Sequence, residues 1–123
     1  MITASFAAMM MAEQGAKVIK VEPMNVGDPM RYIGANKGGI SSLFANCNRG
    51  KQSIRVNLKE SEGQELIREL IPQVDIFIHN FRPGVMDKLN LGSEALRGLH
   101  PRSIYAAISG FGKEGPLGGA PAY

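Results

Sequence analysis

The stretch VDIFIHNFRPGVMDKL, residues 74–89, joins an apolar run to a polar turn and then to a short helical pattern. Its first six residues are rich in β-branched and aromatic side chains, which is typical of a buried strand. Pro83 and Gly84 then favour a turn. Ligands of parallel α/β sheets bind at the carboxyl ends of strands, so the segment HNFRPG is the best candidate for a binding site.

Helices and strands alternate along the rest of the chain. Helix-forming residues, periodic apolar positions and Gly or Pro stops predict helices at residues 6–14, 61–71, 84–89 and 93–101. Period-two and β-branched patterns predict strands at residues 17–22, 53–59, 74–79 and 103–109. Strands separated by helices of this length imply crossover connections, and therefore an α/β fold with a mostly parallel sheet.

Local signals define the expected ends of these elements. Gly15 follows the first helix, where a left-handed cap is common. Ser61 and Gln64 have the spacing of a capping box, and Pro72 should end the helix that follows. The strand at residues 53–59 alternates between an apolar face of Ile54, Val56 and Leu58 and a polar face of Arg55, Asn57 and Lys59.

The composition describes one globular domain or part of one. The chain has 123 residues, of which 44% are hydrophobic. Its formal net charge of +3 is too small for nonspecific electrostatic attraction of nucleic acid by the whole chain. The apolar run ITASFAAMMMA ends at Glu13 and is shorter than the roughly 20 residues of a membrane span. The single cysteine, Cys47, fits a reducing compartment. We therefore expect a cytoplasmic protein with neither a nucleic-acid nor a membrane partner, and no metal-ligand spacing is present.

The side chains that follow the strand at residues 74–79 suit a nucleotide. Asn80 donates and accepts hydrogen bonds, Phe81 can stack on a flat ring, and Arg82 offers a planar fork for phosphate. In the alternative interpretation, Phe81 is a core residue, Arg82 is a solvated charge and the remaining residues only form a turn. The residues by themselves favour neither interpretation.

A second candidate is the basic segment NRGKQSIRVNLK, residues 48–59. It carries four cations that could attract a phosphate cluster: Arg49, Lys51, Arg55 and Lys59. A basic strand is more often a solvated face, and that interpretation is favoured for this segment taken alone.

Other chemistries lack part of their pattern. Glu22 ends a strand and could bind a ribose, but the glycine loop of a dinucleotide site is absent, since Ala4 and Ser5 precede the first helix. His79 and His100 are expected to be structural. No nucleophile motif of the G-x-S-x-G type occurs.

Five motifs in order resemble the family III CoA-transferases and the related α-methylacyl-CoA racemases. They are GAKVIKVEPMNVGDPMR, NRGKQSIRVNLK, NFRPGVMDKLNLG, HPRSIYAAISGFGKEGP and the closing PAY. The resemblance implies a Rossmann-like sheet in the large domain of an interlocked homodimer. It also implies transfer of coenzyme A between an acyl-CoA and a carboxylic acid through an aspartyl-CoA thioester, with the CoA thioester as substrate and no permanently bound cofactor.

The same resemblance implies a set of CoA-binding residues. Val56 and Lys59 match positions near the adenine and the 3'-phosphate, and Asn80 and Phe81 match positions beside the nucleotide and the pantetheine arm. Lys88 stands where relatives have an arginine that meets the CoA phosphates. Arg82 belongs to the same motif, and Tyr123 stands where the racemases have a catalytic histidine and the transferases a tyrosine.

The resemblance also implies that the chemistry lies outside residues 1–123. The nucleophilic aspartate of the family follows the PAY motif, so no catalytic residue is expected in this chain. We expect residues 1–123 to be an amino-terminal fragment of the large domain that binds CoA without turning it over, with dimerisation doubtful. The alternatives are a racemase-like isomerase, which Tyr123 disfavours because a phenol does not titrate near neutrality, and a non-catalytic CoA- or nucleotide-binding remnant.

Overall fold

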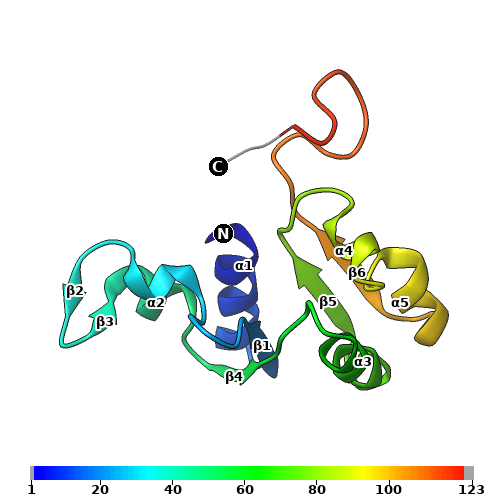
Figure 1. Cartoon of the computed structure of the whole chain (residues 1–123). Helices are drawn as coiled ribbons and strands as arrows, with labels where there is room; N and C mark the ends of the chain where they lie inside the picture. The colour runs from blue at the N-terminus through cyan, green and yellow to red at the C-terminus, as the bar shows by residue number, and fades with distance from the viewer. Residues whose placement is uncertain (1, 121–123) are drawn as a thin grey trace. The chain divides into compact units, whose positions relative to one another are not determined.

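The computed structural model describes residues 2–120, which form two compact units divided after Asn57 (Figure 1). No shift in composition marks this division. Each unit combines helices with one pair of parallel strands. This mixture of helices and short parallel sheets confirms the predicted α/β class.

The first unit is built around β1 (Val18–Glu22) and β4 (Lys51–Arg55). The two strands pair in parallel, from Val18 opposite Lys51 to Glu22 opposite Arg55. Helix α1 (Ile2–Glu13) precedes β1 and ends as predicted before Gly15, whose φ of 98° requires the left-handed region. The helix begins four residues earlier than predicted, so Ala4 and Ser5 lie within it and not before it.

The segment between β1 and β4 holds elements that the sequence did not predict. They are the 3₁₀-helix η1 (Pro29–Tyr32), the antiparallel hairpin of β2 (Asn36–Lys37) and β3 (Ile40–Ser41), and helix α2 (Ser42–Cys47). Two side chains define the starts of the helical elements. Asp28 accepts a hydrogen bond from the Met30 N–H at 2.8 Å, and Ser41 Oγ accepts one from the Phe44 N–H at 3.3 Å.

The strand predicted at residues 53–59 is displaced toward the amino terminus. β4 ends at Arg55 because β1, its only strand partner among the described residues, ends at Glu22. One further bond follows, from the Val56 N–H to the Glu22 carbonyl at 2.9 Å. The predicted alternation of side chains persists beyond the strand, since Val56 is buried while Arg55 and Asn57 are exposed.

The second unit pairs β5 (Ile76–His79) with β6 (Ile104–Ala107) in parallel, from Ile76 opposite Ile104 to His79 opposite Ala107. Its helical elements are α3 (Ser61–Leu70), η2 (Ile71–Gln73), α4 (Val85–Lys88) and α5 (Ser93–Leu99). The buried apolar side chains of this unit are Ile67, Ile71, Met86, Leu91 and Leu96. All four predicted helices therefore exist, within a few residues of their expected bounds.

The predicted capping box at the start of α3 is wrong. Ser61 is the first helical residue, Glu60 is the N-cap, and no side chain caps the helix. Gln64 instead donates from Nε2 to the Leu58 carbonyl at 3.1 Å. The end of the helix is as predicted, because α3 stops at Leu70 and Pro72 lies in the 3₁₀ turn that follows.

Candidate functional site

The candidate site lies at the carboxyl end of β5 in the second unit. Since β5 and β6 run parallel, the β5–α4 connection and the long loop after β6 leave from the same end of the strand pair (Figure 1). The β5–α4 connection carries the segment HNFRPG, and Gly84, with a φ of 82°, is the N-cap of α4. The segment HNFRPG therefore lies at the carboxyl end of a parallel strand, as the sequence predicted.

Two buried polar atoms at this strand end are unsatisfied. His79 is the last residue of β5, and its side chain is only 9% exposed. Its Nδ1 accepts a hydrogen bond from the Phe81 N–H at 3.2 Å, but its Nε2 has no partner within the described residues. The Nδ2 of Asn80 is likewise buried and unpartnered there. Buried polar groups are normally hydrogen-bonded, so two neighbouring exceptions distinguish this strand end from the rest of the described residues.

Aromatic rings surround the imidazole of His79. Tyr105 of β6 meets it edge-on at 5.2 Å between ring centroids, and Phe77 and Phe81 each lie at 6.1 Å. Burial lowers the pKa of His79 below its ordinary value of 6.5; Asp87 opposes this shift and Lys113 adds to it. This shift favours the neutral imidazole.

Three of the groups predicted to bind CoA in this region are accessible. Phe81 is 47% exposed although it is a large apolar side chain, and Arg82 is exposed beside it. Lys88, the last residue of α4, is exposed as well. Phe81 and Arg82 are exposed on the β5–α4 connection, and Lys88 is exposed on α4. An exposed aromatic ring and two exposed cations suit an aromatic ligand that carries phosphates.

The loop after β6 adds a glycine-rich segment at the same end. The Gly112 N–H donates to Ser109 Oγ at 3.0 Å, and the Gly119 N–H donates to the Gly112 carbonyl at 3.1 Å. Lys113 is exposed within this loop. These bonds fold the glycine-rich segment back on itself at the carboxyl end of β6.

The remaining predicted site residues are distributed differently. Val56 is buried in the first unit, and Lys59 is exposed in the second. The structure thus groups Asn80, Phe81 and Arg82 on one connection, followed by Lys88. Tyr123 lies outside the described residues.

The acidic strand end in the first unit is a structural cluster. Arg31 binds the buried Glu22 carboxylate through Nε at 2.9 Å and Nη2 at 2.8 Å. Ser53 Oγ and the Asp28 N–H complete the shell at 2.7 and 2.8 Å. The hydrogen bond from Arg31 is the main cause that lowers the pKa of Glu22 from 4.5 to about 2. With its oxygens occupied, Glu22 is not available to a ribose.

The first two cations of the basic segment, Arg49 and Lys51, make contacts within the first unit. Lys51 donates from Nζ to the Ser5 carbonyl at 2.7 Å, to the Cys47 carbonyl at 2.7 Å and to Asn48 Oδ1 at 3.2 Å. Burial lowers its pKa to about 8. Arg49 pairs with Glu13 at 2.7 Å. Through these contacts the two cations connect α1, α2 and β4. Their role in this part of the segment is therefore structural, and they are not free to attract a phosphate cluster.

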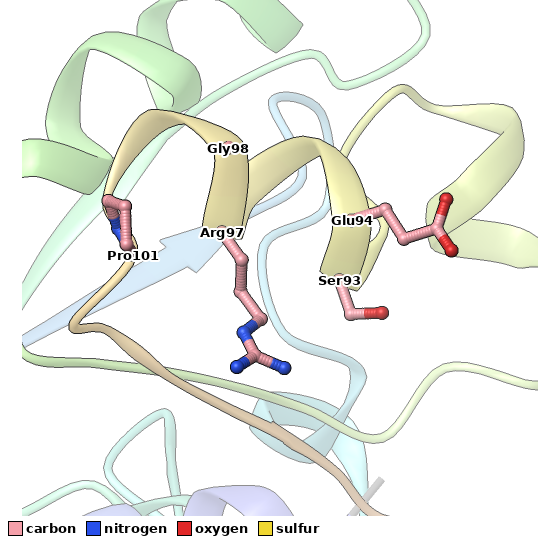
Figure 2. A pocket seen from close by; sticks show the side chains of 5 residues that line it. All are labelled: Ser93, Glu94, Arg97, Gly98 and Pro101. Carbon is pink, nitrogen blue, oxygen red and sulfur yellow. The ribbon is translucent and has the colours of Figure 1, made fainter.

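A shallow depression on α5 is a weaker candidate (Figure 2). Its volume is about 420 Å³, and it is lined by Ser93, Glu94, Arg97, Gly98 and Pro101. Pro101 lies just before β6, so this depression belongs to the amino end of that strand. It contains no buried unpartnered polar atom among those found in the described residues.

Residues 2–120 contain neither a candidate membrane-spanning helix nor a candidate metal cluster. No helix there is long and apolar enough to cross a membrane. No group of three or more His, Cys, Asp or Glu side chains in that range is placed to hold a metal ion.

The fold is that of part of an α/β protein, with a candidate binding motif at the carboxyl end of one of its parallel strands. The sequence model of CoA-transferase family III matches residues 1–123. The chain therefore belongs to CoA-transferase family III.

Individual relatives agree with this assignment. The chain is 43% identical over 118 residues to an acetyl-CoA:oxalate CoA-transferase of Acetobacter aceti, covering 96% of this chain and 30% of that protein. It is 39% identical over 113 residues to the human succinyl-CoA:glutarate CoA-transferase, covering 91% and 26%. The chain thus spans less than a third of the length of these curated relatives.

Solved structures give the same result for the fold. A CaiB/BaiF family protein from Brucella suis superposes with a TM-score of 0.89 at 37% identity, covering 97% of this chain and 32% of that one. A hypothetical protein from Mycobacterium tuberculosis superposes with a TM-score of 0.88 at 34% identity, covering 97% and 33%.

One feature of this strand end had no signal in the sequence. The Nε2 of His79, a residue expected to be structural, is buried and has no partner within the described residues.

Proposed function

We propose that residues 1–123 supply CoA-binding groups to an enzyme that moves coenzyme A between an acyl-CoA and a carboxylic acid. The family match supports this, and the names of curated relatives consistently describe CoA transfer. The observation that carries the proposal is the end of β5, where unpartnered Asn80 Nδ2 lies next to the exposed Phe81 and Arg82.

In this proposal each group meets a different part of CoA. Phe81 offers its ring to the adenine or to the pantetheine arm, and the Asn80 amide donates to a polar atom nearby. Arg82 and Lys88 attract the phosphates, with Arg82 providing a planar fork and Lys88 a point charge. Val56 and Lys59 serve the adenine and the 3'-phosphate, and Tyr123 completes the set.

We propose further that the nucleophile of the reaction is not among the aspartates of these 123 residues. Covalent CoA transfer needs a carboxylate that is free to attack a thioester. Asp28 is bound by Lys20 and caps η1, which leaves it poorly suited to that role. In the whole enzyme, an aspartate that follows Tyr123 would form the aspartyl-CoA thioester within an interlocked homodimer.

Binding can be tested by calorimetry with CoA. We expect heat with the wild-type chain and on the order of fivefold weaker binding for Lys88→Ala, since a charge-assisted contact to phosphate is lost. Lys37→Ala removes an equally exposed lysine from β2 in the first unit and serves as the matched control. No heat with the wild-type chain, or equal affinities for the three proteins, would contradict the proposal.

Turnover can be tested by incubating the 123-residue chain with an acyl-CoA and a carboxylate acceptor. We expect no transfer above the uncatalysed background. Transfer would show that a nucleophile exists within the chain. A parallel measurement of α-proton exchange on a 2-methylacyl-CoA separates the racemase alternative, which predicts exchange without transfer.

A further inference from the structure

The strand pair of the first unit leaves one edge of β1 unpaired. Among the described residues β4 is the only strand that pairs with β1, so the opposite edge of β1 has no partner strand there. The Val56 N–H donates to the Glu22 carbonyl, which shows that the backbone groups of Glu22 point toward β4. Because successive residues of a strand point their backbone groups in opposite directions, those of Ile19 and Val21 point toward the open edge.

The open edge of β1 is apolar. Ile19 is 42% exposed and Val21 is 36% exposed. The outer edge of β4 is different, since the residues whose backbone groups point away from β1 are Lys51, Ser53 and Arg55. Charged residues normally protect a strand edge from pairing, whereas an exposed apolar edge is a template for another strand. The edge of β1 is therefore the one of this pair that is suited to strand addition.

A second copy of β1 matches this edge. Two identical strands that run antiparallel about a two-fold axis exchange N–H···O bonds through the same residues, so the edge is its own complement. Such a pairing places Ile19 of one copy opposite Val21 of the other, with Lys20 nearest the axis. The Lys20 ammonium is largely buried and paired with Asp28 in its own chain. The midpoint of the pairing therefore carries no exposed like charges, which would oppose it.

The residues around β1 limit the length of the pairing. Lys17 precedes the strand, and Pro23, which has no backbone N–H, follows it. Lysine and proline are the residues with which natural proteins restrict strand edges. The open edge between them offers the backbone groups of Ile19 and Val21. A contact this small fits a weak and reversible dimer.

We infer that residues 1–123 form a weak homodimer in which the open edges of two β1 strands pair antiparallel through the backbone groups of Ile19 and Val21. The pairing joins the two-stranded parallel sheets of two copies into one larger sheet. Sheets of three or more strands are more stable on their own than isolated strand pairs. The pairing requires no CoA, so it holds or fails independently of the proposed function.

Analytical ultracentrifugation over a wide range of protein concentration tests the dimer. We expect the wild-type chain to sediment as a monomer when dilute and to approach a dimer when concentrated. Ile19→Lys brings two ammonium groups together across the pairing and should raise the dissociation constant about tenfold. Circular dichroism would verify that each protein is folded. An unchanged dissociation constant for Ile19→Lys would overturn the inference.

Two substitutions of the same kind serve as controls. Ile76→Lys changes a residue of β5 that is 40% exposed and whose backbone groups point away from β6. Phe6→Lys changes the exposed apolar face of α1, where Phe6 is 48% exposed. We expect both variants to dimerise like the wild-type chain. If either control weakened the dimer as much as Ile19→Lys, the assignment to the edge of β1 would be wrong.

Hydrogen exchange of the backbone amides, followed by NMR, tests the pairing in the wild-type chain without a substitution. The amides of Lys20 and Glu22 point toward β4 and should be protected at every concentration. Those of Ile19 and Val21 should exchange quickly in the monomer and become protected as the dimer forms. A dimer that leaves these two amides unprotected would overturn the inference. So would a chain that stays monomeric at all concentrations, which would leave the edge to a strand of another polypeptide.

Discussion

The buried polar groups at the ends of β1 and β5 differ in how completely they are satisfied. At the end of β1, Glu22 is held by Arg31, Ser53 and the Asp28 backbone. At the end of β5, His79 Nε2 and Asn80 Nδ2 have no partner within residues 2–120. A saturated cluster contributes to stability, whereas a buried polar atom without a partner is unfavourable. The comparison therefore separates a saturated strand end from an unsatisfied one within the same chain.

The largest effect should come from removing Arg31. Arg31→Ala leaves the Glu22 carboxylate buried without its cation and also removes a guanidinium that lies 3.9 Å from the Phe44 ring centroid. We expect the free energy of unfolding to fall by about 4 kcal/mol, measured by urea denaturation. Arg55→Ala, at an exposed arginine in the same unit, is the control and should change it by less than about 0.5 kcal/mol. Similar values for the two variants would refute the structural role of the cluster.

Acid should weaken the same cluster. The pKa of Glu22 is about 2 in the folded chain against an ordinary value of 4.5. The unfolded chain therefore takes up the proton first as the pH falls, so stability is fully present above about pH 4.5 and is lost toward pH 2. We expect this group to account for about 3 kcal/mol, measured as the difference in pH dependence between wild type and Glu22→Gln. Parallel profiles in the two proteins would contradict the assignment.

A smaller effect is expected at Gly27, which packs against the cluster. Its φ is 66°, and a Cβ there would lie 2.8 Å from Glu22 Oε2. We expect Gly27→Ala to lower the free energy of unfolding by about 2 kcal/mol, through strain and contact together. Gly38→Ala is the matched control, because Gly38 has a φ of 59° with no atom within 4 Å of the added Cβ, and should cost about 1 kcal/mol. Equal losses would mean that the contact with Glu22 contributes nothing.

The smallest effect on stability should appear at the other strand end. Phe81 is 47% exposed, so Phe81→Ala should change the free energy of unfolding by less than about 0.5 kcal/mol. CoA binding should nevertheless weaken, because the ring is lost from the candidate site. A large loss of stability would show that Phe81 is a core residue, so that the end of β5 would also have a structural role.

Much of the fold was predictable because its signals are local. Val18 to Glu22 and Ile76 to His79 are β-branched or apolar runs closed by loops, and α3 has periodic apolar positions before Pro72. The hairpin of β2 and β3 and helix α2 carry weak local patterns and were missed. The capping box failed because Ser61 lies inside the helix, and a spacing rule does not determine which residue is the N-cap.

The sequence by itself determined the α/β class and the motif HNFRPG at a strand end, since both depend on neighbouring residues. Only the tertiary structure decided which polar groups are already satisfied. The hydrogen bond between Ser53 and Glu22 joins residues that are 31 positions apart in the sequence. The bond between Lys51 and Ser5 joins residues that are 46 positions apart. No local sequence pattern predicts either bond. The same holds for His79, because its burial depends on Tyr105 across the sheet. Saturation of hydrogen bonds is a property of three-dimensional packing, and here it distinguishes the Glu22 carboxylate from the His79 imidazole.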